Sequence, residues 1–311
     1  MVRDYGRLDS FGSRLARDLV KNYGLYLLLV PALLFYTLFC YKPLYGAIIA
    51  FKRYVPTKGI VASPWVGLTH FEAFFGSYYF WRLLRNTLTI SLSSLVIGFP
   101  APIIFALLLN ELRNERFKKI VQTVTYLPHF ISMVVMCGLI RLFTQDTGVV
   151  VQALSLFGFE PVSLLSRAEY FVPVYVLSGV WQGIGWGSII YLSALTGIDP
   201  ELYEAATIDG ANRWRQTLHV TLPGIAPTII IMLLLWMGSV MNVGYEKIIL
   251  LYNEGIYETA DVISTFVYRK GLEQAQWSYS AAVGLFNSVV NFVIIVLMNR
   301  FSRAITDVSL W

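Results

Sequence analysis

The sequence predicts an all-α polytopic membrane protein with six transmembrane helices. Of the 311 residues, 56% are hydrophobic and only 14% are charged, whereas an ordinary soluble domain has about 25% charged residues. Six windows of at least 18 residues contain no Asp, Glu, Lys or Arg, and roughly 20 apolar residues cross a bilayer as a helix. The windows cover residues 23–41, 86–110, 120–140, 170–198, 228–245 and 274–299.

The positions of the basic residues predict that both termini are cytoplasmic. If residues 1–22 lie inside, thirteen of the 24 Lys and Arg residues fall inside and seven outside, while Lys42, Arg85, Arg141 and Lys247 lie too near span ends to assign. An excess of Lys and Arg in cytoplasmic loops is typical of membrane proteins. This topology accounts for the net charge of +5, so we expect a lipid bilayer and no nucleic acid as partner.

The segment before the first span has two interpretations. Leu8, Phe11, Leu15 and Leu19 recur at spacings of three and four among basic residues, which suits a helix lying in the inner membrane interface. A disordered basic tail fits equally well. We therefore divide the chain into this cytoplasmic segment (1–22), a membrane domain (23–303) and a cytoplasmic tail (304–311).

Proline and glycine predict how the spans pack. Pro100, Pro102 and Pro128 fall inside charge-free windows, where proline kinks a helix and neighbouring helices satisfy the freed carbonyls. Gly179, Gly183 and Gly187 recur every four residues. Such a row of small residues lets another helix approach closely.

A polar stretch of residues 199–222 separates the fourth and fifth windows and predicts a compact helix–turn–helix. Asp199 is a candidate N-cap, followed by Pro200 at the first helical position. Gly210 is a candidate stop, because glycine adopts the left-handed conformation at low cost. Asn212 is a candidate cap for a second short helix.

The sequence contains no recognisable catalytic chemistry. It has no phosphate-binding loop, so we expect no ATP hydrolysis by this chain. Its three histidines lack second ligands at metal spacing. We therefore predict a non-enzymatic subunit with no catalytic residue, no metal and no cofactor of its own.

Amides and aromatic rings at membrane depth favour a neutral hydroxylated solute. Amides offer donors and acceptors together, and flat rings stack on sugars, although the amides could equally cross-link helices. The charged residues near outer span ends, Arg85, Arg141, Glu246 and Lys247, could snorkel, pair with one another or attract an acidic sugar. The neutral candidates are Trp181, Gln182, Trp186, Trp236, Asn242, Tyr245, Asn287 and Asn291.

The polar stretch resembles the EAA loop of binding-protein-dependent ABC importer permeases. The family pattern is Glu-Ala-Ala, three residues, Gly, nine residues, an aliphatic residue, one more, then Leu-Pro. This sequence matches every position, with Val220 as the aliphatic residue. The resemblance implies that a loop at about 197–225 couples to an ATPase through Glu204, Ala205, Ala206, Asp209, Gly210, Leu222 and Pro223.

Further stretches look like the oligosaccharide permeases of maltose-type importers. They are KPLYGAIIAFK (42–52), SPWVGL (63–68), ADVIST (260–265) and AVGLFNS (282–288). The resemblance implies the six-helix type I importer permease fold in a bacterial cytoplasmic membrane. It also implies a second homologous permease, two cytoplasmic ABC ATPase subunits that bind ATP and Mg, and an extracellular or periplasmic solute-binding protein that delivers the sugar.

Family resemblance places sugar contacts on the spans flanking the EAA loop, which here offer Gln182, Trp186, Trp236, Asn242 and, more weakly, Tyr245. We therefore expect an ATP-driven importer of oligosaccharides, with uronate-containing chains such as alginate or pectin fragments left open. The alternatives are an ABC permease for another solute such as glycerol phosphate and an ion-coupled secondary transporter.

Overall fold

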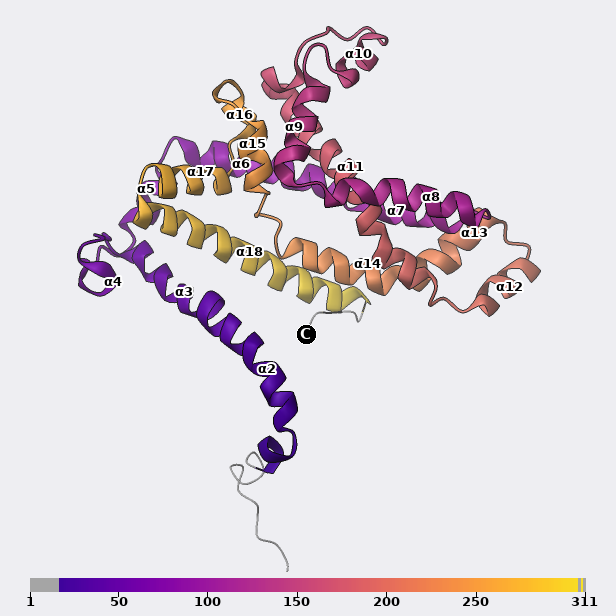
Figure 1. Cartoon of the computed structure of the whole chain (residues 1–311), viewed down its shortest axis with the longest axis horizontal. Coiled ribbons are helices and arrows are strands. Elements are labelled where there is room, and N and C mark those ends of the chain that lie inside the picture. The colour runs from indigo at the N-terminus through magenta and orange to yellow at the C-terminus, as the bar shows by residue number, and fades with distance from the viewer. Residues whose placement is uncertain (1–16, 307–308, 310–311) are drawn as a thin grey trace, which may run out of the picture. The chain divides into compact units, whose positions relative to one another are not determined.

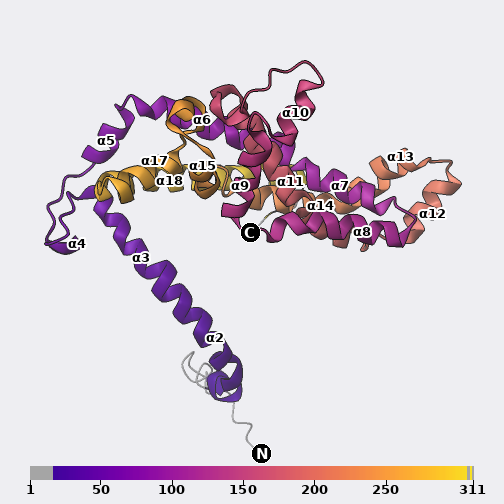
Figure 2. The same cartoon turned by 45° about the horizontal axis from the view of Figure 1, so that its top comes forward.

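The computed structural model describes residues 17–306 and 309, and the described part is helical, without a named strand (Figures 1 and 2). The chain divides into two compact units, Met1–Gly67 and Leu68–Trp311. The predicted interfacial segment (1–22) and tail (304–311) lie largely outside the described residues, so the proposed boundaries stay predictions.

The first unit carries a candidate membrane span over Tyr23–Phe51, whose most apolar window has no buried residue. An apolar helix exposed on all sides suits lipid. At the end of this span Phe51 stacks on Trp65 at 5.7 Å, and the Lys52 Nζ donates to the carbonyls of Ile60 and Val61. The helical segments are α2 (Tyr23–Phe35), η1 (Tyr36–Tyr41), α3 (Lys42–Leu44), η2 (Tyr45–Phe51) and α4 (Gly59–Ala62).

The second unit contains the remaining helices. Its first half consists of α5 (Thr69–Phe75), α6 (Tyr79–Ser93), η3 (Ser94–Gly98), α7 (Pro100–Asn110), α8 (Glu115–Tyr126), η4 (Leu127–Phe130), α9 (Met133–Thr144), α10 (Val149–Ser155), η5 (Leu164–Ser166) and α11 (Ala168–Leu195). Its second half consists of α12 (Pro200–Ile208), α13 (Arg213–Gln216), η6 (Thr217–Thr221), α14 (Leu222–Met237), α15 (Tyr245–Leu251), η7 (Glu254–Ile256), α16 (Tyr257–Ala260), α17 (Ile263–Tyr268), η8 (Arg269–Glu273) and α18 (Trp277–Thr306).

Five helical stretches of the described chain are long and apolar enough to cross a membrane, one fewer than predicted. The exception is α11, which has 28 residues and would span about 42 Å at 1.5 Å per residue, but whose Trp, Gln, Gly and Ser residues reduce its hydropathy. The five stretches are Tyr23–Phe51, Tyr79–Asn110, Met133–Ser155, Arg213–Met237 and Trp277–Ala304.

The prediction of one span over residues 120–140 is wrong. Pro128 lies in a short 3-10 segment, and the chain is extended at Ile131 and Ser132 before α9 begins. Proline removes a backbone donor from this segment, and the chain leaves the helix three residues later. The candidate span therefore begins at Met133.

The fifth predicted window also ends differently, because α14 stops at Met237 and residues 238–244 are not helical. Side chains from other helices form hydrogen bonds with backbone groups of this segment. Ser91 donates to the Val240 carbonyl, Asn291 accepts from the Met241 N–H at 2.9 Å, and Ser264 donates to the Val243 carbonyl at 2.9 Å. Non-helical backbone is tolerated at membrane depth only when it is satisfied in this way or lines a cavity.

A buried ion-pair cluster joins α6 to the α16–α18 region. The Asp261 side chain is fully buried and lies 2.7 Å from Arg269 and 3.4 Å from Arg82. Burial alone would lower the pKa of Arg269, but its hydrogen bonds with Asp261 raise that pKa above its ordinary value. The Asn86 amide also donates to the carbonyls of Glu258 and Asp261, so this contact fixes the C-terminal helices against α6.

The α11 helix packs tightly on α8 and α7 through two glycines. A Cβ atom at Gly185 would lie 2.3 Å from the Thr125 carbonyl oxygen, and one at Gly187 would lie 3.0 Å from Pro102. At Gly183 nothing lies within 4 Å of such an atom. The predicted glycine row therefore gives close helix contact at Gly187, while Gly185, outside the row, gives the closer approach.

We predict that Gly185→Ala destabilises the protein and that Gly183→Ala does not. At Gly185 the methyl group meets backbone atoms of α8, which cannot rotate away, and overpacking of this kind costs about 1–3 kcal/mol. Thermal unfolding of the purified protein in detergent measures the difference. Equal melting temperatures for the two variants would contradict the close packing of α11 on α8.

Candidate functional site

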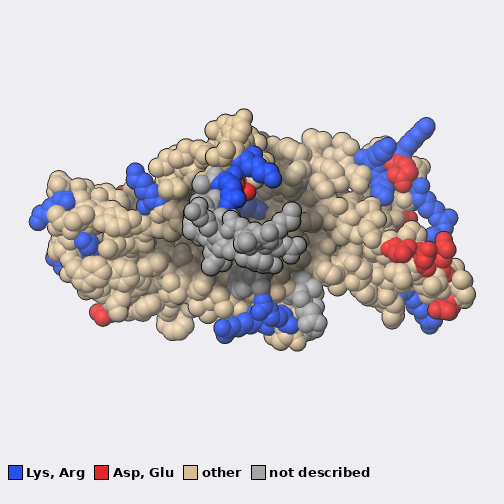
Figure 3. All heavy atoms as spheres, turned by 90° about the horizontal axis from the view of Figure 1, so that it is seen from below, with Lys and Arg blue, Asp and Glu red and all other residues tan. Residues whose placement is uncertain are grey.

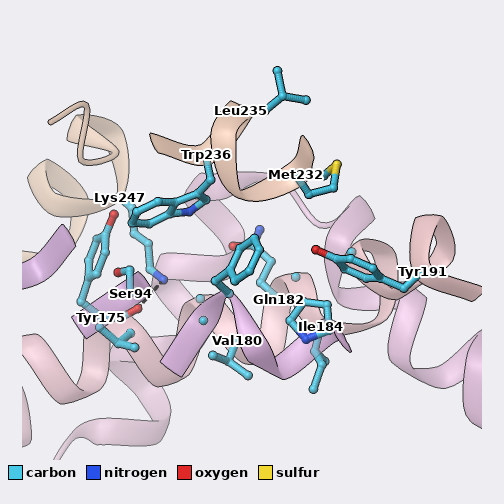
Figure 4. Close-up of a pocket in the computed structure, with 17 residues that line it drawn as sticks. Ser94, Tyr175, Val180, Gln182, Ile184, Tyr191, Met232, Leu235, Trp236 and Lys247 are labelled. Atoms are coloured by element: carbon cyan, nitrogen blue, oxygen red, sulfur yellow. Dashed lines mark hydrogen bonds between the residues drawn. The ribbon is translucent and has the colours of Figure 1, made fainter. Parts of the chain in front are cut away.

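A cavity of about 490 Å³ lies along α11 in the second unit (Figure 4). Residues of η3, α7, α11, α14 and α15 line it, so segments far apart in the sequence meet here. Gln182, Trp236 and Lys247 all extend into it (Figure 4). Its volume lies within the range of about 300–1,000 Å³ that is usual for small-molecule sites.

Cavity-lining residues recur at every fourth position of α11. Gly179, Gly183 and Gly187 line the cavity, and Tyr175 and Tyr191 continue the same interval on either side. Residues four apart share one face of a helix. At Gly183 this face leaves open space that a larger side chain would fill.

Lys247 brings a buried cation to the cavity. The residue is only 5% exposed, and its Nζ donates to the Tyr175 carbonyl at 2.9 Å and lies 4.6 Å from the Tyr175 ring centroid. Lys247 lies outside the five candidate spans. Burial lowers its pKa to about 8, so the amine is still mainly protonated at neutral pH.

Two of the five predicted sugar-contact residues, Gln182 and Trp236, line this cavity. Asn242 lines a smaller neighbouring cavity of about 160 Å³. There its side-chain oxygen accepts from the amides of Asn287 at 2.7 Å and Asn291 at 3.2 Å. The Asn242 side chain therefore cross-links the non-helical segment to α18.

The other two predicted residues line neither cavity. Trp186 stacks on His129 with ring centroids 4.5 Å apart and is 46% exposed. Tyr245 stacks on Tyr268 at 6.0 Å. Both rings have aromatic partners in this conformation, and a sugar-contact role for them stays a prediction.

Sequence reasoning missed Tyr175 and Tyr191 as lining residues, although a signal was present. Both continue the spacing of the three glycines, so an extension of that row by four residues in each direction finds them. Lys247 was considered only as one of several charges near span ends. Nothing in the sequence distinguishes it from Arg141, which is exposed and outside the cavity.

The polar stretch folds as the predicted helix–turn–helix. The Asp199 side chain caps α12 by accepting from the Glu201 N–H at 3.0 Å, and Asn212 caps α13 in the same way through Arg215. Gly210 adopts φ +77°. Its N–H bonds to the Thr207 carbonyl, and the next N–H bonds to the Ala206 carbonyl, which is the Schellman termination that glycine favours.

This helix–turn–helix presents both charged and apolar side chains. Glu204, Ala205 and Asp209 are exposed, as are Ile208 at 87% and Trp214 at 70%. In Figure 3 charges of both signs gather at the end of the second unit that carries α12 and α13. Of the other implied coupling residues, Ala206 and Leu222 are half-buried, and Gly210 and Pro223 are exposed.

Two contacts join the two halves of the helix–turn–helix, and a third ties it to the rest of the second unit. The Tyr203 hydroxyl lies 3.1 Å from the Thr221 hydroxyl, and the Gln216 amide donates to Thr207 at 3.0 Å. Arg213 forms a 2.8 Å ion pair with Glu111 at the end of α7. The turn is therefore a braced element and not a loose connection.

Comparisons with known proteins agree on one family. The family described as "Binding-protein-dependent transport system inner membrane component" matches residues 98–307. The chain is 44% identical to the polygalacturonan/rhamnogalacturonan transport system permease protein YteP of Bacillus subtilis, over 93% of this chain and 91% of that protein.

Solved structures give the same result. A chain of a bacterial ABC transporter that imports the acidic polysaccharide alginate superimposes with a TM-score of 0.87 and 44% identity, over 94% of this chain and 99% of that one. A second structure of a bacterial alginate transporter, in complex with an alginate pentasaccharide-bound periplasmic protein, matches with a TM-score of 0.87 and 43% identity, over 96% and 100%.

We predict that Asn242→Ala lowers thermal stability and that Gln182→Ala does not. Removing the Asn242 side chain leaves the Asn287 and Asn291 amides without their acceptor, and an unsatisfied buried donor costs about 1–3 kcal/mol. No hydrogen bond of Gln182 would be lost in the same way, because its side chain extends into the cavity. The melting temperature in detergent is the measurement, and an unchanged value for Asn242→Ala would contradict the cross-linking role.

Proposed function

Because this chain belongs to the family of binding-protein-dependent transport system inner membrane components and is the permease of a sugar or polysaccharide ABC importer, we propose that it moves oligosaccharides through the cavity along α11. In this proposal α11 is a further transmembrane helix, the fourth in chain order, which brings the total to six, and both termini are cytoplasmic. The permease acts in the bacterial cytoplasmic membrane and is not itself an enzyme.

One observation carries the proposed mechanism. Arg213–Met237 is a single helical stretch of 25 residues, about 37 Å long at 1.5 Å per residue. It begins in the braced helix–turn–helix and carries Trp236, a residue that lines the cavity, one position before its end. A displacement of the turn would therefore reach the cavity through residues that are helical throughout.

The turn is proposed to be the site at which ATPase movement enters. Two cytoplasmic ABC ATPase subunits would bind ATP and Mg, and their closure would shift α12. Glu204 and Asp209 are exposed and can pair with basic groups, while Ala205 and Ala206 are small enough for close approach. Gly210 allows the sharp reversal, and Leu222 and Pro223 begin α14.

The remaining partners follow from the family. We propose a second homologous permease that completes the pathway, and a solute-binding protein outside the membrane that delivers the sugar. The named substrates of the relatives, polygalacturonan/rhamnogalacturonan and alginate, favour uronate-containing oligosaccharides for this chain. Within the cavity, the Gln182 amide would bind sugar hydroxyls and the Trp236 ring would stack on a sugar face, with Asn242, Trp186 and Tyr245 as further candidates.

We predict that Glu204→Lys abolishes coupling. Reversal of an exposed charge leaves the fold intact but repels a basic ATPase surface, so co-purification of the ATPase subunits and sugar-stimulated ATP hydrolysis should each fall at least ten-fold. Glu115→Lys on α8 is the matched control, because it reverses another exposed charge outside the turn. If the Glu204→Lys variant co-purifies with normal amounts of the ATPase subunits and takes up sugar at the normal rate, this turn is not the coupling element.

We also predict that Gly183→Leu blocks transport without unfolding the protein. A side chain at this position enters open space in the cavity, so it occupies the volume that a sugar would need. Uptake of labelled oligosaccharide into proteoliposomes should fall at least ten-fold, while the melting temperature and subunit ratio stay unchanged. Wild-type uptake by this variant would show that the sugar passes elsewhere.

A further inference from the structure

The cavity contains one basic side chain that its surroundings do not neutralise. Lys247 is the sole Lys, Arg, Asp or Glu among the residues that line it. Among residues 17–306 and 309, it is also the one Lys or Arg that is buried. Buried charges are normally paired, because leaving an ion unpaired in a region of low dielectric constant is costly.

The contacts of Lys247 meet only part of this need. Its amine has three N–H donors, and one of them bonds to the Tyr175 carbonyl. The Tyr175 ring contributes a cation–π contact. No carboxylate of the described residues lies within ion-pair distance, and Glu246, its sequence neighbour, is exposed.

The other basic residues near the ends of the spans are occupied or lie elsewhere. Arg82 and Arg269 pair with Asp261, and Arg85 donates to the Glu258 carbonyl. Arg141 is exposed on α9 and lines no cavity described above. Among the described residues, Lys247 is therefore the basic group that can meet an anion inside the cavity.

We propose that Lys247 binds the carboxylate of a uronic acid residue and so makes this permease selective for acidic over neutral oligosaccharides. The inference rests on the proposed function, because it assigns a role in the same cavity. The neighbouring groups suit a sugar acid: Gln182 supplies an amide for ring hydroxyls, and Trp236 supplies a flat apolar face. The carboxylate would complete the hydrogen bonding of the amine and neutralise its charge.

The experiment uses the complete importer in proteoliposomes and two probes with the same sugar chain: trigalacturonate, whose carboxylates are charged, and its fully methyl-esterified form, which is neutral. Each probe is supplied at a concentration that saturates the solute-binding protein, and ATP-dependent initial uptake is measured. Lys247→Met should lower trigalacturonate uptake at least ten-fold and leave uptake of the ester within two-fold of wild type. Arg141→Met, which also removes a cation, should leave both rates within two-fold.

Several results would overturn the proposal. One is uptake of trigalacturonate by Lys247→Met at the wild-type rate. Another is an equal fall in the uptake of both probes, which would show that Lys247 has a purely structural role. If Lys247→Met does not assemble with its partners, the wild-type importer decides, since equal rates for acid and ester exclude charge selection. A wild-type importer that moves only neutral oligosaccharides overturns this inference alone, whereas one that moves no oligosaccharide overturns the proposed function as well.

Discussion

The architecture of the second unit depends on how the backbone of residues 238–244 is hydrogen-bonded. This segment follows the helix that begins in the helix–turn–helix, and a break in a helix exposes polar groups that lipid cannot satisfy. Ser91, Asn291 and Ser264 supply the missing partners from three different helices. The break is therefore tolerated because side chains of α6, α17 and α18 supply these hydrogen bonds.

In α11, small residues a few positions apart have two different roles: close packing against α8 and lining of the cavity. Gly185 permits contact with the backbone of α8, while Gly179 and Gly183 face the cavity. A helix with larger residues at all these positions would have to move away from its neighbours or fill the cavity. The proposed solute path and the packing of the helices thus depend on different faces of the same helix, α11.

Local features of this chain were predictable from sequence, and long-range contacts were not. The caps at Asp199 and Asn212 and the turn at Gly210 involve residues only a few positions apart, so the sequence contains the whole interaction. The two partners of Asn242, Asn287 and Asn291, lie 45 and 49 residues away on α18, and no periodicity reveals them. The break at residues 127–132 was also missed, because absence of charge does not report where a helix loses its hydrogen bonds.

The exposed apolar side chains of the helix–turn–helix have a consequence for the life of the protein in the cell. Ile208 and Trp214 are among the most exposed large side chains of the second unit, and apolar surface of this kind attracts chaperones, proteases and other unfolded chains. A copy made without the cytoplasmic partners proposed above presents this surface continuously. The amount of permease that accumulates is therefore expected to follow the supply of those partners, so that balanced synthesis of the subunits protects the cell from unassembled copies.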